Sequence, residues 1–459
     1  MKYISTRGKA QKLGFEEVLF AGMASDGGLY VPEEILQFTP AQIARFAGLS
    51  YSELAFEIIN PFIGGEIPEK KLKEIIAESY KVFKHPAVAP LKQLDENEWL
   101  LELFHGPTLA FKDFALQLLG RLLDYFLEKR KEKIVILGAT SGDTGSAAID
   151  GCKNCRNAEI FILHPYGKTS EIQRRQMTTV AAKNVHNIAI KGTFDDCQDI
   201  VKTIFAARDF LPGRKLVAVN SINWARVMAQ IVYYFSAAVS LGSPAKSVSF
   251  SVPTGNFGDI FAGFVAYKMG LPIKKLIIAT NENDILSRFI NANDYAKKRV
   301  KATLSPSMDI QVSSNFERLL FFAHAGDGKE VSRLMADFKK TGRLKVAPQV
   351  LAGIRKIFSG HSTNDKETRG VIKKIHDATG EIVDPHTAVG LSAAWEFKEK
   401  DTPMITLATA HPAKFPAAIK KARVQMAENP LKKLFHKKEK LAILPNSAGK
   451  VREFILKNL

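Results

Sequence analysis

The sequence has few cysteines, no long uncharged apolar run and no excess of acidic residues. Its 3 cysteines in 459 residues are too few for a disulfide framework, and this scarcity favours a reducing compartment. Cys152 and Cys155 have the spacing of a zinc or redox pair, but no second pair follows, so the sequence does not favour a metal site. No uncharged run reaches the roughly 18 residues that cross a bilayer, and the first residues lack the apolar core of a signal peptide. We therefore expect a cytoplasmic protein that contacts no membrane.

Positive charge is in excess, and it is unevenly distributed. The formal net charge is +18, and residues 414–459 carry 12 Lys and Arg against 3 Glu. Apolar residues such as Leu431 and Phe435 are interleaved with these charges, a pattern typical of an amphipathic helix with a solvated face. No recognised nucleic-acid motif accompanies the charge, so we expect no nucleic-acid partner.

Length and alternation predict an α/β protein of several domains. A chain of 459 residues exceeds one ordinary core, and we divide it into residues 1–98, 99–245 and 246–459. The first segment is mixed α/β, and the other two alternate short apolar strands with helices, which is typical of open parallel sheets covered on both faces. Ligands bind such sheets at the carboxyl ends of the strands. The expected strands include residues 134–137, 160–163, 216–219, 248–252 and 276–279.

One lysine has an unusual local setting. Lys112 lies between Phe111 and Phe114, after a Gly-Pro turn and before an apolar helical run at residues 114–131. Desolvation beside the two rings would lower the pKa of the amine and make Lys112 a candidate for Schiff-base chemistry. A lysine that extends toward solvent at a helix start explains the local sequence equally well.

Two loops rich in glycine and polar residues follow predicted strands. Residues 253–259 lie between a strand and a helix, where glycines and helix-start amides accommodate a phosphate. Neither the Walker spacing nor the dinucleotide spacing is present. Residues 140–145 offer hydroxyls and amides at another helix start, suited to a carboxylate or a phosphate. A reactive lysine together with these two loops matches the parts of a pyridoxal phosphate enzyme.

Five motifs, taken together and in order, resemble the threonine synthase family. Two N-terminal stretches, at residues 5–8 and 26–32, extend the resemblance to nearly the whole chain. The resemblance implies fold type II of the pyridoxal phosphate enzymes, with two open parallel-sheet domains, the cofactor between them and an N-terminal α/β domain. The motifs are Phe-His-Gly-Pro-Thr-Leu-Ala-Phe-Lys-Asp at 104–113, Ala-Thr-Ser-Gly-Asp-Thr-Gly at 139–145, Asn-Ser-Ile-Asn-Trp-Ala-Arg at 220–226, Pro-Thr-Gly-Asn-Phe-Gly-Asp at 253–259 and Ala-Thr-Ala-His-Pro-Ala-Lys at 408–414.

The resemblance implies cofactor-binding roles for individual residues. Lys112 would hold pyridoxal 5'-phosphate as a Schiff base and then serve as acid and base. Thr409 would face the pyridine nitrogen, where a neutral hydroxyl leaves the ring a milder electron sink than a carboxylate would. Asp143 stands where other enzymes of this fold often carry an asparagine beside the ring hydroxyl. The phosphate of the cofactor would lie against Gly255, Asn256, Phe257, Gly258 and Asp259.

The resemblance also implies the reaction. O-phospho-L-homoserine and water would give L-threonine and phosphate, which is the last step of threonine biosynthesis. Lys112 would take an α-proton and then a β-proton, phosphate would leave from the γ-carbon, and water would add at the β-carbon. The substrate carboxylate would lie against Thr140, Ser141 and Thr144, and the departing phosphate against Ser221, Arg226 and Asn256.

Several alternatives stay open at the level of sequence. Instead of binding phosphate, Arg226 would make a salt bridge on a helix surface. Residues 168–176 resemble a family segment at the mouth of the active site, or they form a solvated helix start. His164, His386 and His411 would touch substrate or would pack and cap.

Two rival functions also remain. A phospholyase or dehydratase of the same fold would share the motifs and release a keto acid. A protein that has lost catalysis would use its basic tail on RNA or another anion, with binding that weakens as salt rises. We expect a monomer or a homodimer that acts on a small molecule.

Overall fold

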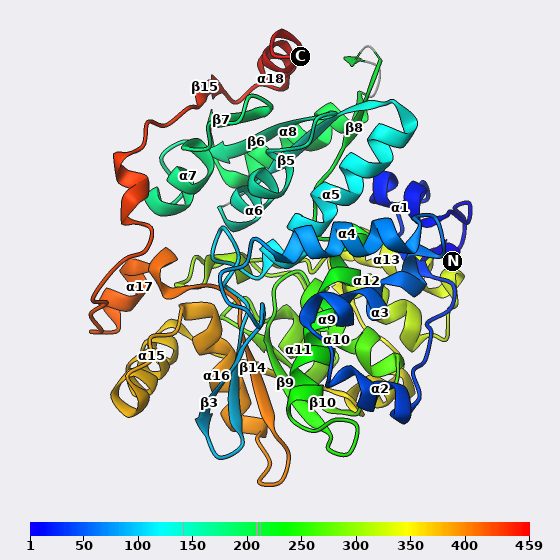
Figure 1. Cartoon of the computed structure of the whole chain (residues 1–459), viewed down its shortest axis with the longest axis vertical. Helices are drawn as coiled ribbons and strands as arrows, with labels where there is room; N and C mark the ends of the chain where they lie inside the picture. Colours follow the sequence, from blue (N-terminus) through cyan, green and yellow to red (C-terminus); the bar gives the residue numbers. More distant parts are fainter. Residues whose placement is uncertain (141, 208–209, 212) are drawn as a thin grey trace.

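Two open sheets organise the computed structural model, which describes residues 1–140, 142–207, 210–211 and 213–459 (Figure 1). The smaller sheet lies in the upper part of the view and the larger sheet in the lower part. Helix α5 (Lys112–Arg130) begins between them and rises along the smaller sheet. The predicted α/β class with parallel sheets is confirmed.

The smaller sheet is wholly parallel and is covered on both faces. Its 5 strands follow the order β15-β7-β6-β5-β8, and they and their helices are β5 (Lys133–Ala139), β6 (Ala158–Pro165), β7 (Val185–Lys191), β8 (Arg214–Val217), β15 (Ala442–Pro445), α6 (Asp143–Cys152), α7 (Glu171–Thr178), α8 (Phe194–Ala206) and α18 (Ala448–Lys457). Ile134 and Ile136 face the core shared with α5 and α6, whereas Val135 and Leu137 face α8 and α18. Burial of both faces explains why the strand is apolar throughout.

The larger sheet has 6 strands in the order β13-β10-β9-β14-β4-β3, and only the pair β3–β4 is antiparallel. The strands are β3 (Leu91–Asp95), β4 (Glu98–Glu102), β9 (Val248–Pro253), β10 (Ile273–Thr280), β13 (Phe358–Ser362) and β14 (Met404–Ala408). Leu276 and Ile278 face α9 (Trp224–Ser240) and α10 (Gly258–Lys268), whereas Ile277 and Ala279 face α16 (Pro385–Phe397). Just after the carboxyl end of β14, Ala410 forms a bridge with Ala110, which lies just before α5, so a ligand site is expected at that edge.

Shorter elements surround the two sheets. The N-terminal part consists of β1 (Tyr3–Ser5), β2 (Tyr30–Pro32), α1 (Phe15–Ala21), α2 (Pro40–Phe46), α3 (Tyr51–Ile63) and α4 (Glu69–Tyr80). Arg318 links this part to the rest of the chain, because its Nη2 lies 2.7 Å from the carbonyl oxygen of Tyr30 and 2.7 Å from that of Ile222. The remaining elements are α11 (Ile285–Ala292), β11 (Tyr295–Ala296), η2 (Pro306–Met308), α12 (Phe316–Ala323), α13 (Gly328–Thr341), β12 (Arg343–Leu344), α14 (Pro348–Arg355), α15 (Asp365–Thr379), η3 (Pro412–Lys414), α17 (Pro416–Lys421) and η4 (Lys432–His436).

Helices α5 and α6 meet at two glycines, and this contact brings the starts of the two helices together. A Cβ atom on Gly120 would come within 2.0 Å of the carbonyl oxygen of Gly151, and one on Gly151 within 2.3 Å of that of Leu116. Only glycine allows the two backbones to approach this closely. The first residues of the two helices, Lys112 and Asp143, are thereby held near each other.

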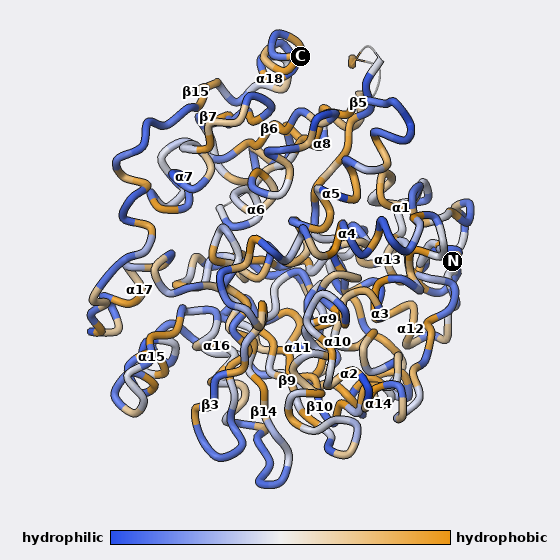
Figure 2. The backbone as a smooth tube through the Cα atoms, viewed as in Figure 1, coloured by the Kyte–Doolittle hydropathy of each residue, from blue (hydrophilic) through white to orange (hydrophobic). Residues whose placement is uncertain are grey.

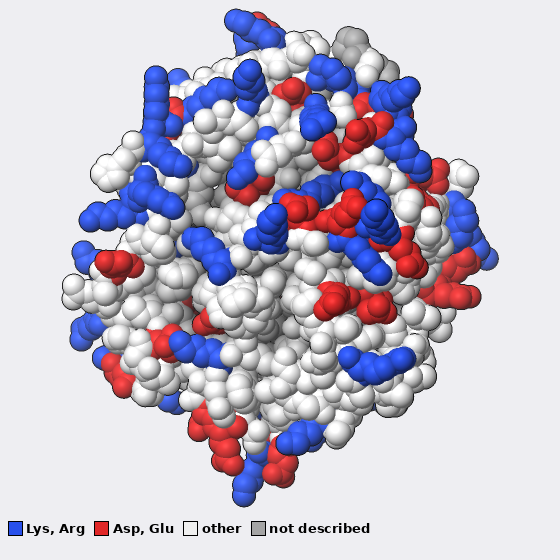
Figure 3. Space-filling view, in the orientation of Figure 1, with Lys and Arg blue, Asp and Glu red and all other residues white. Residues whose placement is uncertain are grey.

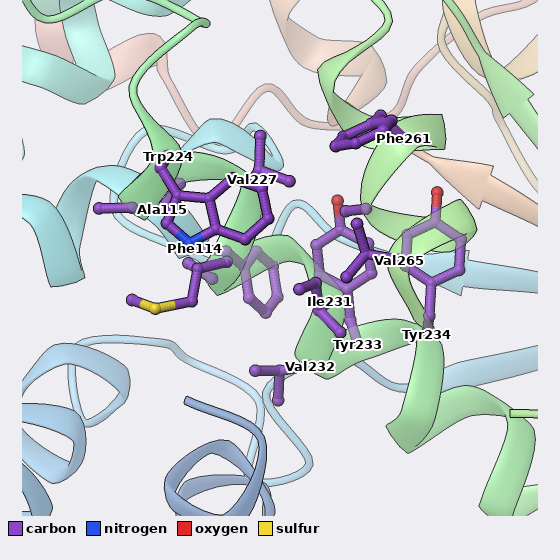
Figure 4. Close-up of a cluster of buried hydrophobic side chains, with 14 of the residues drawn as sticks. Phe114, Ala115, Trp224, Val227, Ile231, Val232, Tyr233, Tyr234, Phe261 and Val265 are labelled. Atoms are coloured by element: carbon purple, nitrogen blue, oxygen red, sulfur yellow. The ribbon is translucent and has the colours of Figure 1, made fainter. Parts of the chain in front are cut away.

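Hydrophobic residues fill the interior between the sheets and helices, and hydrophilic residues occupy outer loops such as the one joining β3 to β4 (Figure 2). An aromatic cluster packs α5 against α9 and α10 (Figure 4). The ring of Phe114 lies 5.4 Å from that of Tyr233, and Tyr234 follows on the same helix. This packing fixes the first turn of α5, which carries Lys112.

The C-terminal segment crosses from the larger half to the smaller half. We expected a solvated amphipathic helix over residues 414–459, and the structure differs, because the range is divided into the short helices α17 and η4, the edge strand β15 beside β7 and the helix α18. Val451 and Ile455 bury their side chains against α8, which explains this docking. Strand β15, from the range 246–459, thus joins the smaller sheet, whereas β4, near the start of the range 99–245, joins the larger sheet. Lys and Arg side chains project along this segment (Figure 3).

Candidate active site

A buried aspartate shapes the loop that precedes the candidate lysine. The carboxylate of Asp113 accepts hydrogen bonds from the backbone N–H of Thr108, at 2.8 Å, and from its hydroxyl, at 2.6 Å. A Cβ on Gly106 would lie 2.5 Å from the Cβ of Asp113, so glycine is required there. Burial raises the pKa of Asp113 to about 6, although both bonds from Thr108 oppose the rise.

Lys112, the first residue of α5, is almost entirely desolvated. Its side chain is 11% exposed, and its Nζ lies 3.7 Å from Oδ2 of Asp143 and 5.5 Å from the ring centre of Phe111. Burial lowers the pKa of the Lys112 amine to about 8; Asp143 raises it, and the charges of Lys414 and Arg226 lower it further. The expected desolvation is present, but Phe114 packs in the aromatic core, so Phe111 is the ring beside the amine.

Asp143, the first residue of α6, lies at the centre of a polar cluster. Its Oδ1 is 2.9 Å from Nζ of Lys414 and accepts a hydrogen bond from Nε2 of Gln173 at 2.9 Å. Its Oδ2 accepts one from the hydroxyl of Ser307 at 3.1 Å. Burial alone would raise the pKa of Asp143, but Lys414, Lys112 and these hydrogen bonds hold the pKa well below its usual range. The carboxylate is therefore ionised.

One hydroxyl links Thr140 to two glycines, Gly142 and Gly145. Oγ1 of Thr140 accepts the backbone N–H groups of Gly142 and Gly145, each at 2.9 Å. A Cβ on Gly145 would lie 2.4 Å from Cγ2 of Thr140. Thr144 is half-buried at the second residue of α6, and Ser141 lies outside the described residues. The described residues of the predicted substrate-carboxylate loop are therefore held together at a helix start.

The second loop, Gly255 to Asp259, contains one left-handed residue and leads into the first turn of α10. Phe257 has the left-handed φ of 63° immediately before α10, and its ring packs against Phe316 and Phe358 in the core. The first N–H groups of a helix have no partner within it, and a left-handed residue next to a helical turn directs successive N–H groups into one concavity. This geometry suits a phosphate.

Asp259 and Asn256 use their side chains differently from each other. The Asp259 carboxylate turns into the core and accepts hydrogen bonds from the hydroxyls of Tyr233 and Tyr234, and burial raises its pKa to about 7. Its backbone amide is thus the group that remains for a phosphate. Asn256 is exposed, and its Oδ1 accepts the hydroxyl of Ser314 at 3.3 Å.

Thr409 follows the last residue of β14 and lies beside the lysine loop. Its carbonyl oxygen accepts the N–H of Phe111 at 2.9 Å, and Ala110 pairs with Ala410 in an isolated bridge. These two backbone contacts hold Thr409 next to the loop that carries Lys112.

Arg226, on the first turn of α9, is a buried cation. It is 5% exposed, its Nη1 is buried without a hydrogen-bond partner, and within the described residues it makes no ion pair. Burial lowers its pKa to about 10. A surface salt bridge, the alternative considered from the sequence, does not describe this side chain. An unpaired buried guanidinium is costly in a folded protein unless an anion arrives to pair with it.

Ser221 belongs to a short chain of hydroxyl and amide groups. Its Oγ lies 2.9 Å from Oγ of Ser314, which also contacts Asn256. Asn315 donates from Nδ2 to the carbonyl oxygens of Ser221, at 3.2 Å, and Asn256, at 3.0 Å. The motifs at residues 220–226 and 253–259 are thus joined through residues that lie outside both.

Two of the three candidate histidines make hydrogen bonds with structural roles. Nδ1 of His386 lies 2.7 Å from Asp384, and its Nε2 accepts the N–H of Ser307 at 3.2 Å. His411 accepts the N–H of Ala413 at 3.1 Å as a cap, and His164 is buried. Across the described residues, no cluster of three or more His, Cys, Asp or Glu side chains is arranged to hold a metal ion. No described helix is both long and apolar enough to cross a membrane.

Several residues at the site received no role from the sequence and are brought there by the fold. Lys414 ends the motif at residues 408–414, and Gln173 lies in the segment 168–176, so the sequence provided a reason to consider both residues. Ser307 and Ser314 come from a stretch without a recognised motif, and only folding brings them to Asp143 and Asn256.

The chain matches three family models in succession. These are the threonine synthase N terminus over residues 2–80, the pyridoxal-phosphate dependent enzymes over residues 82–336 and the threonine synthase C-terminal model over residues 387–455.

Known proteins resemble the chain along its whole length. The threonine synthase of Pseudomonas aeruginosa is 58% identical over 99% of this chain and 98% of its own length, and that of Saccharomyces cerevisiae is 46% identical over 92% and 88%. A pyridoxal phosphate-bound threonine synthase from Brucella melitensis superposes with a TM-score of 0.97 at 51% identity, covering 100% of this chain and 99% of that one. The yeast enzyme superposes with a TM-score of 0.94 at 41% identity, covering 100% and 98%.

Proposed function

The chain belongs to the threonine synthase family, and from this premise we propose which of its residues carry out the reaction. Its function is the conversion of O-phospho-L-homoserine and water to L-threonine and phosphate, with pyridoxal 5'-phosphate as cofactor. Its fold is that of the fold type II pyridoxal phosphate enzymes.

The residues at the site fit pyridoxal phosphate. Lys112 offers an amine of lowered pKa, about 8, for the aldehyde of the cofactor. The amides of residues 255–259 form a concavity for its phosphate, and a Cβ atom at Gly255 would lie only 2.9 Å from the carbonyl oxygen of Ser307, so the loop requires glycine there. Thr409, whose backbone contacts Phe111, would supply a neutral hydroxyl for the ring nitrogen, and Asp143 supplies a carboxylate 3.7 Å from the Lys112 amine.

When bound, the cofactor withdraws electrons from the substrate and makes protons next to its amino carbon removable. In our proposal, Lys112 takes the α-proton, then a β-proton, and returns protons in the later steps. A group with a pKa of about 8 suits this double role, because both of its protonation states are populated near neutral pH.

We assign the binding of the two anionic ends of the substrate to separate loops. The carboxylate lies against Thr140, Ser141 and Thr144. The Thr140 oxygen already accepts two amide hydrogens, which leaves its own hydroxyl hydrogen to donate. The phosphate lies against Arg226, with Ser221 and Asn256 beside it.

One observation carries this arrangement: Arg226 is buried with an unpartnered Nη1 and no protein counter-ion among the described residues. A phosphate that pairs with it in this desolvated setting is held firmly and is stabilised as it leaves with additional negative charge. The γ-phosphate of O-phospho-L-homoserine supplies that anion.

The test is to quantify phosphate and threonine together after turnover of O-phospho-L-homoserine by the cofactor-loaded protein. We expect equal amounts of both. Phosphate accompanied by a keto acid would instead indicate a phospholyase. In the matched control, Lys112→Ala, turnover falls by at least about 10³-fold and the visible absorbance of the bound cofactor is lost, while the protein stays folded. Normal turnover by this variant would contradict the assignment.

The setting of the enzyme is also a proposal. The scarcity of cysteine supports a reducing compartment, so we place the protein in the cytoplasm. We propose that it acts as a monomer or a homodimer without a nucleic-acid partner.

A further inference from the structure

A second lysine is buried more deeply than Lys112 and has no role in the proposed reaction. Lys414 ends the short helix η3 after β14, and its side chain is 0% exposed. Its Nζ lies 2.9 Å from Oδ1 of Asp143 and donates to the carbonyl oxygen of Thr108 at 2.8 Å. Burial of an ammonium group costs several kcal/mol unless it is paired, so a purely structural need would be met more cheaply by an apolar side chain.

Asp143 is shared between two cations. Its Oδ1 faces Lys414 at 2.9 Å, and its Oδ2 faces Lys112 at 3.7 Å. The other groups on the carboxylate, Gln173 from α7 and Ser307 from η2, are neutral. Two further charged groups lie near the lysines. The charge of Arg226, on α9, lowers the pKa of Lys112, and the charge of Lys414 lowers the pKa of Asp113, on α5.

We propose that Lys414 is a positioning residue that sets the protonation of Lys112. It holds the Asp143 carboxylate in place, and its charge balances that carboxylate so that Asp143 does not confine Lys112 to the ammonium form. The inference rests on the proposed role of Lys112 as acid and base.

The charges act in opposite directions on the catalytic amine. Without Lys414, the carboxylate would form a tight pair with Lys112 alone and raise its pKa. Without the carboxylate, two ammonium groups would face each other in a desolvated site, and the pKa of Lys112 would fall. The lowering of the Lys112 pKa to about 8 by burial, with Asp143 opposing and Lys414 assisting, agrees with this balance.

Lys414 also ties together two loops that the reaction needs. Thr108, whose carbonyl it binds, precedes Lys112 and is held by Asp113, and the same carbonyl accepts Nε2 of Gln176 at 2.9 Å. If Lys414 were only structural, it would act through these backbone contacts alone. A structural role would leave the protonation of Lys112 unchanged, whereas the proposed positioning role alters it.

The experiment follows the rate at which the full-length protein, freed of cofactor, takes up pyridoxal phosphate as a function of pH. Only the neutral amine attacks an aldehyde, so the rate rises with pH through the pKa of Lys112. We expect Lys414→Met to move the midpoint up by about one to three pH units and Asp143→Asn to move it down by a similar amount. One unit is about tenfold in rate at a fixed pH below the midpoint.

The double variant Lys414→Met with Asp143→Asn removes both charges. We expect its midpoint to lie between those of the single variants, because the two removed charges act in opposite directions on Lys112. It also keeps the proposal testable if Lys414→Met does not fold. The acidic limb of the kcat/KM profile of the loaded enzyme should shift in the same directions.

Lys373→Met is the matched control. It breaks an exposed pair with Asp377 on α15, at 2.8 Å, without touching Lys112, Asp143 or their partners, and we expect an unchanged midpoint. Midpoints that stay at the wild-type value in both single variants, or that move in the same direction, would overturn the proposal. A wild-type protein that makes no threonine while the midpoints shift in opposite directions would refute the proposed reaction and leave this inference standing.

Discussion

Single residues at this site take their chemistry from burial. Lys112 and Arg226 both lose water, and the pKa of each falls, to about 8 and about 10 respectively. Their partners differ, because Lys112 has Asp143 at 3.7 Å whereas the Nη1 of Arg226 has none among the described residues. In the proposed reaction, Lys112 exchanges protons, and Arg226 stays charged and binds an anion.

Arg226→Met should separate substrate binding from folding. We expect kcat/KM for O-phospho-L-homoserine to fall by about 10²–10³-fold through loss of the charge-assisted contact. A substrate with an uncharged leaving group should be affected far less, and stability without ligand should be unchanged or higher because an unpaired buried charge is removed. Steady-state kinetics with both substrates and urea unfolding check this.

Arg318→Met is the contrasting control. Its guanidinium is also fully buried but donates to the carbonyl oxygens of Tyr30 and Ile222. Its replacement should destabilise the protein by about 3–5 kcal/mol. Equal losses of both substrates' turnover in Arg226→Met would argue against its phosphate role.

At the scale of elements, close helix packing positions the reactive groups. Helices α5 and α6 cross at Gly120 and Gly151, and their first residues are Lys112 and Asp143. The distance between the two helix axes therefore determines the distance between amine and carboxylate.

Gly151→Ala should push the two helices apart. The added Cβ would lie 2.3 Å from the carbonyl oxygen of Leu116, which is backbone and cannot rotate away. We expect a destabilisation of about 1–3 kcal/mol and a fall in kcat of about 10–100-fold. Gly370→Ala on α15 has open space around its Cβ and should gain about 0.5–1 kcal/mol with normal activity. If Gly151→Ala is destabilised but keeps a normal kcat, the spacing of the two helices does not control catalysis.

The contact between α9 and α10 makes stability depend on pH. The pKa of Asp259 is raised by burial to about 7, whereas an aspartate in an unfolded chain has a pKa of about 3.9. The folded state binds the proton more tightly, so the stability from this group is present below about pH 4 and is lost as the pH rises toward 7. The loss is at most about 4 kcal/mol.

Asp259→Asn should flatten this dependence. The amide oxygen still accepts from Tyr233 and Tyr234, and no charge forms above pH 7. We expect the difference in urea midpoint between pH 5 and pH 8 to shrink in this variant and to stay as in wild type in Asp377→Asn, a half-exposed residue on α15. An unchanged difference in Asp259→Asn would mean that the carboxyl titrates normally.

At the scale of the molecule, the C-terminal segment joins the two halves. It leaves α17 beside the larger sheet and ends with β15 and α18 on the smaller sheet (Figure 1). Between them, Glu439 pairs with Arg174 and accepts the hydroxyl of Thr178 at 2.6 Å. Helix α7, which supplies Gln173 to Asp143, is thus held by this segment.

Ile455→Ala should weaken the docking of α18. Ile455 is 0% exposed against α8, and its truncation should cost about 2–5 kcal/mol. Leu456→Ala is the neighbouring control, since this side chain is 47% exposed, and it should change stability by less than about 0.5 kcal/mol. Hydrogen exchange of α8 and β7 checks which part opens. Equal protection in both variants would show that the helix does not stabilise the smaller sheet.

The sequence alone determined the features that depend on neighbours along the chain. The strand and helix alternation predicted the parallel sheets, and the motifs around Lys112 and Gly255 identified the family, the cofactor and the reaction. These features are local because a strand, a helix start or a glycine turn is specified by residues a few positions apart.

Only the tertiary structure decided how those parts are charged and connected. Asp143 and Lys414 pair at 2.9 Å although more than half of the chain separates them, and Asp259 turns to tyrosines instead of the phosphate loop. The basic tail, which the sequence predicts as a solvated helix, contributes an edge strand to the smaller sheet. Such outcomes depend on which elements the folded chain brings together, and burial at those contacts then determines the pKa of each group.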